Sequence, residues 1–192
     1  GERVAGTVGQ ALPGVSVRVV DDVNRALAVG EIGNVQVRGP NVFKGYWRMP
    51  EKTREEFTDD GWFKTGDVGR FGGDARIPDN YLSIVGRSKD LIISGGFNIY
   101  PKEIEAIIDE MAGVAESAVI GVPHSDFGEA VVAVIVPKPG AVIDGPRLQA
   151  ELKALIANFK VPKRIHVIDQ LPRNTMGKVQ KNLLREAYKE QG

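Results

Sequence analysis

The chain has 192 residues, with 25 basic and 25 acidic side chains, two histidines and no cysteine. This balance of charge gives no reason to expect nucleic acid or an anionic membrane as a partner, and no run approaches the ~18 consecutive apolar residues of a membrane span. Disulfides, thiol nucleophiles and Cys-ligated metals are excluded, and His124 and His166 alone cannot build a multi-histidine site. We therefore expect no metal ligands within these residues, in a cytoplasmic protein whose chemistry relies on lysine, arginine, carboxylates, hydroxyls and backbone groups.

The first 86 residues are predicted to be mostly β-structure. Alternating apolar side chains indicate strands at residues 15–20 and 35–38, and a further strand is expected at residues 81–85. An aromatic loop leads to a short helix at residues 50–57, where Pro50 suits the first turn. Many short strands with Gly-rich turns favour a small barrel or a sandwich-like unit.

Beyond residue 100 the apolar period becomes that of helices. Residues 101–111 place apolar side chains at i, i+3, i+4 and i+7, which predicts an amphipathic helix. The elements expected after it are strands at 118–122 and 130–136, a helix at 147–158, a strand at 164–168 and a helix at 179–189. The last two helices are expected to bury Leu148, Leu152, Leu155 and Ile156, and Leu183, Leu184 and Ala187, respectively. This order predicts a compact α+β domain.

Between these two regions, residues 84–105 change character three times. A charged loop, GRSKD at residues 86–90, precedes an apolar run at 91–93, a Ser-Gly-Gly turn at 94–96 and a helix start at Pro101. One interpretation is a plain hairpin that leads into a helix. The other is a functional junction, in which the paired glycines let the backbone approach a ligand closely.

Several charged residues are candidates for chemistry. Asp67, in the segment KTGDVG, can accept hydrogen bonds from two sugar hydroxyls, although an Asx-turn or a helix N-cap is the alternative. Arg87 can donate to phosphate or ribose oxygens, or it belongs to a solvated turn with one local ion pair. Lys178, in the loop PRNTMGK at 172–178, can neutralise charge on carboxylate and phosphate oxygens, or it is simply solvated.

The segment FKVPKR at residues 159–164 combines an aromatic ring with cations. Phe159 and Lys163 can stack on and pair with a nucleotide, or the segment is a bare basic cluster. The loop around Lys178 is not a Walker A loop, because the first glycine and the hydroxyl residue after the lysine are missing. We assign His124 and His166 structural roles.

Taken in order, TGD at 65–67, GRSKD at 86–90 with SGGFNIYPKEIE at 94–105, and PRNTMGK at 172–178 resemble the adenylate-forming superfamily of acyl-CoA synthetases, peptide-synthetase adenylation domains and luciferases. Within it, GPNVFKGYWRMPEKT at 39–53 looks most similar to malonyl-CoA synthetases. The resemblance implies two steps. A carboxylate attacks the α-phosphorus of ATP to give an acyl-adenylate and pyrophosphate, and the CoA thiol then displaces AMP.

The resemblance also implies roles for single residues in the first step. Asp67 would hold the ribose hydroxyls, and Arg87 would assist at ribose or phosphate. Lys178 would reach the reacting carboxylate and the α-phosphate during adenylation only. Lys89 matches the hinge position, about which the C-terminal domain of the family pivots between an adenylating and a thioester-forming pose.

For the second step, the resemblance places four residues at coenzyme A. Gly95 and Gly96 would line the pantetheine tunnel, where glycines leave room for the thiol arm. Phe159 and Lys163 would contact the CoA nucleotide. ATP and CoA are thus the expected cofactors, and malonate is the expected acid.

The resemblance implies, further, that these residues are the C-terminal portion of a larger enzyme. The family's phosphate loop, its adenine-binding segment and its Thr–Glu pair for Mg²⁺ would lie upstream, so we expect this chain alone to be inactive. The expected fold class is α+β, with residues 1–88 as a β-rich subdomain of the large adenylating domain and residues 89–192 as a compact, mobile α+β C-terminal domain. Two alternatives remain. One is an interaction module modified at Lys178 by a protein lysine acetyltransferase and restored by a deacetylase, and the other is part of an adenylation domain that loads a carrier protein.

Overall fold

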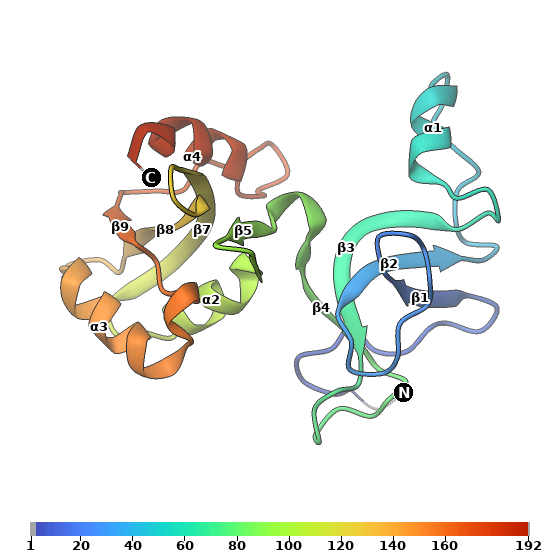
Figure 1. Cartoon of the computed structure of the whole chain (residues 1–192), viewed down its shortest axis with the longest axis horizontal. Coiled ribbons are helices and arrows are strands. Elements are labelled where there is room, and N and C mark those ends of the chain that lie inside the picture. Colours follow the sequence, from blue (N-terminus) through green and yellow to red (C-terminus); the bar gives the residue numbers. More distant parts are fainter. Residues whose placement is uncertain (1–2, 192) are drawn as a thin grey trace. The chain divides into compact units, whose positions relative to one another are not determined.

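The computed structural model describes residues 3–191, which form two compact units on either side of the bond between Lys89 and Asp90 (Figure 1). The first unit is rich in β-structure, and the second combines helices with a mixed sheet. The fold class is therefore α+β, as expected. None of the described helices is long and apolar enough to cross a membrane.

The first unit is built on one antiparallel sheet. Its strands are β1 (Ser16–Val20), β2 (Gly33–Arg38), β3 (Phe63–Phe71) and β4 (Leu82–Arg87), and they lie side by side in this order. The helix α1 (Pro50–Glu56) belongs to the β2–β3 connection and stands off the end of the sheet (Figure 1). Because β1 and β4 are the two outer strands of a single meander, the expected barrel or sandwich is not formed in the described part of the unit.

β3 was not expected as a strand, because its sequence KTGDVG has the composition of a turn. The structure accommodates these residues with register shifts between β3 and both of its neighbours. Gly69 has a steric reason to be glycine, since a Cβ there would lie 2.6 Å from the Ser83 carbonyl oxygen of β4. Strand pairing with β2 and β4 therefore overrides the local preference for a turn.

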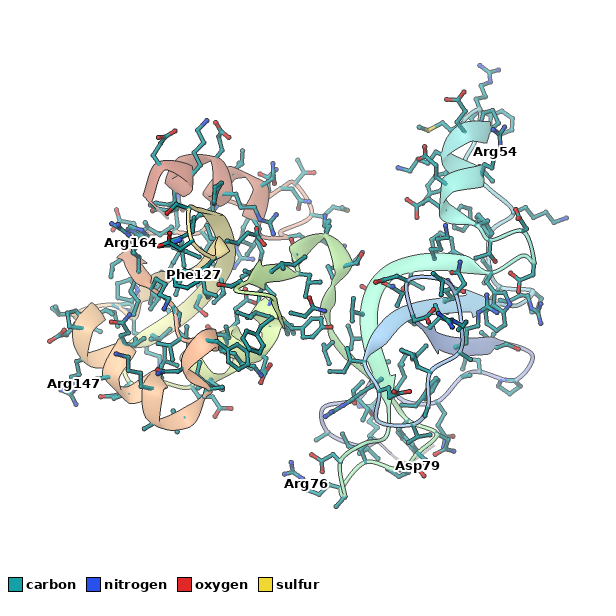
Figure 2. All side chains as sticks on the ribbon, viewed as in Figure 1. Arg54, Arg76, Asp79, Phe127, Arg147 and Arg164 are labelled. Atoms are coloured by element: carbon teal, nitrogen blue, oxygen red, sulfur yellow. The ribbon has the colours of Figure 1, made fainter. Side chains whose placement is uncertain are left out.

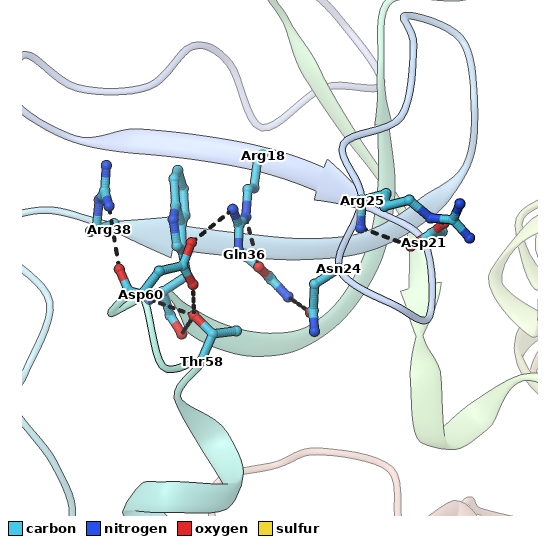
Figure 3. A network of polar contacts seen from close by, with 9 residues as sticks. Arg18, Asp21, Asn24, Arg25, Gln36, Arg38, Thr58 and Asp60 are labelled. Carbon is cyan, nitrogen blue, oxygen red and sulfur yellow. Dashed lines mark hydrogen bonds and ion pairs between the residues drawn. The ribbon is translucent and has the colours of Figure 1, made fainter.

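One face of this sheet carries a small apolar core around Val19, Val35 and Leu82. A polar network crosses the sheet from β1 to the β3 side (Figure 3). Gln36 is almost fully buried, but its amide is paired: it accepts from Arg18 Nε at 2.8 Å and donates to Asn24 Oδ1 at 2.6 Å. Arg18 and Arg38 lie over the ring of Trp62, at 4.3 Å and 4.7 Å from its centroid. The hydrogen bonds to Arg18 and Asn24 thus offset the cost of burying the Gln36 amide.

The second unit contains β5 (Ile92–Ser94), β6 (Phe97–Ile99), α2 (Pro101–Ile108), β7 (Val114–His124), β8 (Gly128–Pro137), α3 (Gly145–Leu155), β9 (Arg164–Val167) and α4 (Lys181–Tyr188). The described residues also form the 3₁₀ turns η1 (Ser88–Asp90), η2 (Asn158–Lys160) and η3 (Lys189–Gln191). The sheet has the antiparallel order β6-β5-β8-β7, and β9 pairs in parallel with β8.

Apolar residues cover both faces of β7 and β8, so each strand is a nearly continuous apolar run rather than an alternating one. On one face, Val119 and Ile135 pack with Ile104 of α2 and Leu152 of α3. On the other face, Ile120 and Val134 pack with Leu184 of α4. α4 accordingly lies on the opposite side of the hairpin from α2 and α3 (Figure 1).

Two expected helix faces need correction. α3 ends at Leu155, and that side chain is 62% exposed because the helix does not continue to position 158. α4 starts at Lys181 and turns Leu184 and Tyr188, one turn apart, toward the sheet. Leu183 and Ala187 therefore face away from the core and are exposed.

Candidate active site

Asp67 and Arg87, both expected at the nucleotide, lie opposite each other in the β3–β4 ladder. Arg87 Nε is 2.8 Å from Asp67 Oδ1, and the pair is partly open to solvent. Asp67 lies in a strand rather than in an Asx-turn or an N-cap, and its N–H donates to the Thr65 hydroxyl at 3.0 Å. An exposed ion pair contributes only about 0–1 kcal/mol to stability, so stability is a weak reason for this arrangement.

A hollow of about 740 Å³ in the first unit reaches this pair through Gly66 and Arg87. Its other lining residues are Asp21, Asp22, Asn24, Asn34, Val35, Gln36, Tyr46, Lys52, Glu56, Phe63, Lys64, Thr65, Ser88 and Lys89. The lining is more polar and charged than that of a typical small-molecule pocket. The lining has four cations, since Lys52, Lys64 and Lys89 join Arg87, against the three carboxylates of Asp21, Asp22 and Glu56. The cations are the groups that can pair with the phosphates of a ligand.

Lys89 is exposed and lies between two residues that are each tied to their own unit. The Ser88 hydroxyl donates to the Gly66 carbonyl of the first unit at 3.2 Å. Asp90 accepts from Arg185 Nη2 of α4, in the second unit, at 2.8 Å. A rotation about the backbone of Lys89 therefore leaves both anchoring contacts intact, as a hinge residue requires.

Gly95 and Gly96 form the two-residue turn between β5 and β6, with φ of +56° and +82°. Positive φ at both positions is what a type I′ hairpin turn needs, and glycine adopts it without strain. A Cβ on Gly96 would meet nothing within 4 Å, and one on Gly95 would meet only the Phe127 ring, at 3.7 Å. Turn geometry, rather than crowding within the second unit, thus accounts for these glycines.

The four residues expected at coenzyme A are brought together in the second unit by two further aromatic rings. Phe159, in η2, stacks on Phe97 beside the glycine turn, with 4.3 Å between ring centroids. Phe127, at the β7–β8 turn (Figure 2), accepts the Gly95 N–H at its carbonyl and lies 5.2 Å from Lys163 Nζ. Sequence reasoning missed Phe127, since a single aromatic residue in a loop carries no distinctive signal.

A second hollow, of about 400 Å³, lies next to this group and is lined by Gln149, Lys153, Asn158, Phe159, Val161 and Lys163. It combines an aromatic ring with two lysines. That combination can stack on a base and neutralise a phosphate.

Lys178 lies exposed on a well-organised turn between β9 and α4. Asn174 Oδ1 accepts from the N–H groups of Met176 and Lys178 at 3.0 Å and 2.9 Å, and the Asn174 N–H donates to the Lys178 carbonyl at 2.9 Å. Across residues 3–191, the Lys178 ammonium has no ion-pair partner. Its charge is therefore free to pair with a ligand.

The two histidines pack against aromatic rings. His166 stacks on Tyr188 at 4.2 Å, and burial, with a smaller effect of Arg164, lowers the pKa of its imidazole. His124 packs against Phe127, and its Nδ1 accepts the Asp126 N–H. No group of three or more His, Asp or Glu side chains in the described chain could hold a metal ion.

Two family descriptions match the chain: "AMP-binding enzyme" at residues 1–47 and "AMP-binding enzyme C-terminal domain" at residues 103–178. Together with the relatives below, they show that the chain belongs to the adenylate-forming superfamily of carboxylate–CoA ligases.

Among its relatives, malonate–CoA ligase of Arabidopsis thaliana is 42% identical over 100% of this chain and 32% of its own length. Indoleacetate–CoA ligase of Aromatoleum aromaticum is 42% identical over 96% of this chain and 35% of its own length. ATP-bound MatB from Rhodopseudomonas palustris is 60% identical, with a TM-score of 0.91 over 99% of this chain and 37% of that structure. The chain thus spans about a third of the length of the curated relatives it matches.

Proposed function

We propose that the protein containing these residues is an ATP-dependent carboxylate–CoA ligase whose acid is malonate. Residues 1–88 end its adenylating domain, and residues 89–192 are its mobile domain. One observation carries the proposal. The chain pairs Asp67 with Arg87 at the edge of a hollow lined by lysines and carboxylates. The exposed, organised turn that presents Lys178 agrees with it.

In the first step, a carboxylate oxygen attacks the α-phosphorus of ATP, the bond to the β-phosphate breaks, and pyrophosphate leaves. The Asp67 carboxylate accepts hydrogen bonds from the ribose hydroxyls, and Arg87 uses its remaining N–H groups at ribose or phosphate. The Lys178 ammonium stabilises the negative charge that develops between the carboxylate and the α-phosphate. A Mg²⁺ ion would neutralise charge on the phosphates, but the described residues offer no cluster of ligands to hold it.

In the second step, the CoA thiolate attacks the acyl carbon, and AMP leaves with the bonding electron pair. The turn of Gly95 and Gly96 carries no side chains and leaves room for the pantetheine arm to pass. Phe159 stacks on the nucleotide of CoA, and Lys163 pairs with its phosphate groups. Lys89 rotates between the two steps. Its neighbours Ser88 and Asp90 are each anchored to one unit, so the rotation falls on the residue between them.

The ligase function is tested with two proteins. The 192-residue chain alone is expected to show no malonate-dependent ATP–pyrophosphate exchange, because it lacks a Gly-rich phosphate loop. A chimera that joins this chain to the first two thirds of the Arabidopsis malonate–CoA ligase is expected to form malonyl-CoA. A folded chimera that binds ATP but forms neither adenylate nor thioester would contradict the proposal.

The choice of acid and acceptor is tested with the complete protein. The likeness to malonate–CoA ligase and to MatB favours malonate, but the indoleacetate ligase is equally identical to the chain at 42%. The expected result is a higher kcat/KM for malonate than for indoleacetate, with free CoA as a better acceptor than a carrier protein. The opposite order would assign another acid or acceptor.

The exposure of Lys178 favours a second role, as the substrate of a protein lysine acetyltransferase whose product a deacetylase reverses. Acetylation removes the positive charge and would stop the first step. Intact-mass analysis after incubation with an acetyltransferase and acetyl-CoA is expected to show one added acetyl group. The same mass gain in Lys178→Arg would place the modification elsewhere.

A further inference from the structure

We propose that Arg173 and Glu116 are positioning residues that hold the Lys178 turn against the sheet and thereby set the rate of adenylation. The inference rests on the function proposed above for Lys178. It adds two residues to which neither the sequence motifs nor the family comparisons assign a role.

The Arg173 side chain contacts two separate parts of the second unit. Its Nη1 donates to the Gly177 carbonyl at 2.7 Å, inside the turn and one residue before Lys178. Its Nη2 forms an ion pair with the carboxylate of Glu116, 57 residues away in sequence. Glu116 belongs to β7, where it pairs with Val136 of β8. One guanidinium thus joins the turn to the central hairpin of the unit.

The other contacts of the turn have a different effect. The bonds between Asn174 and Lys178, the bond from the Gly177 N–H to Asn174, and the bridge between Arg173 and Val179 set the internal shape of the turn. They join residues of the turn to one another. Leu171 and Val179, at the two ends of the turn, pack on the apolar cluster beneath α4, so the part between them can still tilt about these ends while all of these contacts persist. The contact with Glu116 opposes that tilt because it ends on a strand.

This arrangement has a kinetic consequence for one step only. A cation that stabilises the negative charge developing in the transition state must lie within hydrogen-bond reach of it. A displacement of about 1 Å at a reacting group can cost a hundredfold in rate. Without the Arg173 anchor, Lys178 spends less time at the productive position, and adenylation slows. Thioester formation does not use Lys178 and keeps its rate.

The alternative is that the pair only stabilises the fold. The Arg173 and Glu116 side chains are 44% and 33% exposed, and ion pairs with this exposure contribute little to stability. A purely structural role also predicts equal losses in both half-reactions. The two roles therefore separate in a measurement of the individual steps.

The test uses the complete protein and measures malonate-dependent ATP–pyrophosphate exchange separately from thioester formation from supplied acyl-adenylate. Arg173→Ala and Glu116→Ala are expected to lower kcat of exchange by about ten- to a hundredfold with little change in the KM for ATP. Thioester formation is expected to stay within about twofold, since Lys178 takes no part in it. Glu116→Gln, which keeps a hydrogen-bond acceptor, should lie between Glu116→Ala and the unchanged protein.

Arg147→Ala is the matched control, since Arg147 projects from α3 (Figure 2) and forms an exposed ion pair with Glu151 in the same unit. It is expected to change neither half-reaction. If exchange is unchanged in Arg173→Ala and Glu116→Ala, or if both half-reactions fall together, the positioning role is wrong.

Lys178→Ala separates this inference from the proposed function. If Lys178→Ala loses adenylation while Arg173→Ala keeps it, only the positioning role fails. If Lys178→Ala keeps adenylation, the function proposed for Lys178 fails, and the positioning role fails with it. The double variant Arg173→Ala/Lys178→Ala is expected to be no slower in exchange than Lys178→Ala alone, because both changes remove the same interaction.

Discussion

Glu105 of α2 connects three elements of the second unit, and its loss should destabilise that unit alone. β7 is an outer strand of the sheet, so N–H groups on its free edge have no neighbouring strand. Glu105 Oε1 accepts the Val119 N–H of β7 at 2.8 Å and pairs with Lys181 Nζ of α4 at 2.5 Å. Both charged side chains are only 16% exposed. One carboxylate thus covers the strand edge and ties down the first residue of α4.

The expected cost of Glu105→Ala is about 3 kcal/mol. An unpaired buried N–H costs about 1–3 kcal/mol, and a broken buried ion pair costs about 3–5 kcal/mol. The expected cost lies below the sum of these two costs, about 4–8 kcal/mol, because the Lys181 ammonium can regain water once its partner is removed. Glu105→Gln keeps an acceptor for Val119 and loses only the charge, so its expected cost is about 1–2 kcal/mol.

The distribution of chromophores allows each unit to be followed separately in urea. Both tryptophans, Trp47 and Trp62, belong to the first unit, whereas α2, α3 and α4 give the second unit most of the helix. With an m-value of about 1–2 kcal/mol/M, Glu105→Ala should lower the midpoint followed by circular dichroism at 222 nm by about 1.5–3 M. The midpoint followed by tryptophan fluorescence should not change. Glu151→Ala, which removes an exposed helix pair, is the control and should shift neither transition.

Equal costs for Glu105→Ala and Glu105→Gln would refute the role of the Val119 N–H. A shift of the fluorescence transition together with the helical one would refute the assignment of the effect to the second unit.

Three further predictions concern nucleotide binding, packing and pH. On the function proposed above, Asp67→Ala should raise the KM for ATP of the complete protein by about tenfold, through loss of the proposed ribose hydrogen bonds, worth about 1.4 kcal/mol. Asp74→Ala, which removes an exposed ion pair of the same unit, should not. Gly69→Ala should destabilise the first unit by about 1–3 kcal/mol, because its Cβ would overlap a backbone oxygen of β4, and the tryptophan transition should fall without the helical one. His166 has a lowered pKa when folded, so the unfolded chain binds more protons below the ordinary value of 6.5. The stability of the second unit should therefore fall as the pH drops below about 6.5, and His166→Phe should flatten that dependence in urea titrations; an unchanged slope would contradict the assignment.

The elements that sequence patterns predicted well are those in which burial and local preference agree. α2 follows its apolar stripe and begins at Pro101, and the apolar runs of β7 and β8 mark strands buried on both faces. The sequence did not predict β3, because its residues favour turns and strand pairing around Gly69 overrides that preference. The exposed positions of Leu155 and Leu183 follow from where α3 ends and where α4 begins, and apolar periodicity alone does not fix either boundary.

The candidate site, too, was predicted from the sequence only in part. Short motifs carried enough chemistry to single out Asp67, Arg87 and Lys178, and the roles assigned to them remain predictions. The pairing of Asp67 with Arg87 depends on the register of β3 and β4, which neither motif encodes. The contact between Arg173 and Glu116 joins residues 57 positions apart, so it becomes visible only when the chain is folded.

Because both faces of the β7–β8 hairpin are buried, variants with weakened helix packing are prone to aggregate. Residues 118–122 and 130–136 are uncharged and rich in β-branched side chains, and such segments aggregate when they are exposed. α2 and α3 cover one face of the hairpin and α4 covers the other, so loosening of any one helix bares part of these segments. By covering these segments, the helices protect the folded chain from aggregation. Variants that weaken their packing are expected to precipitate while most of their secondary structure is still intact.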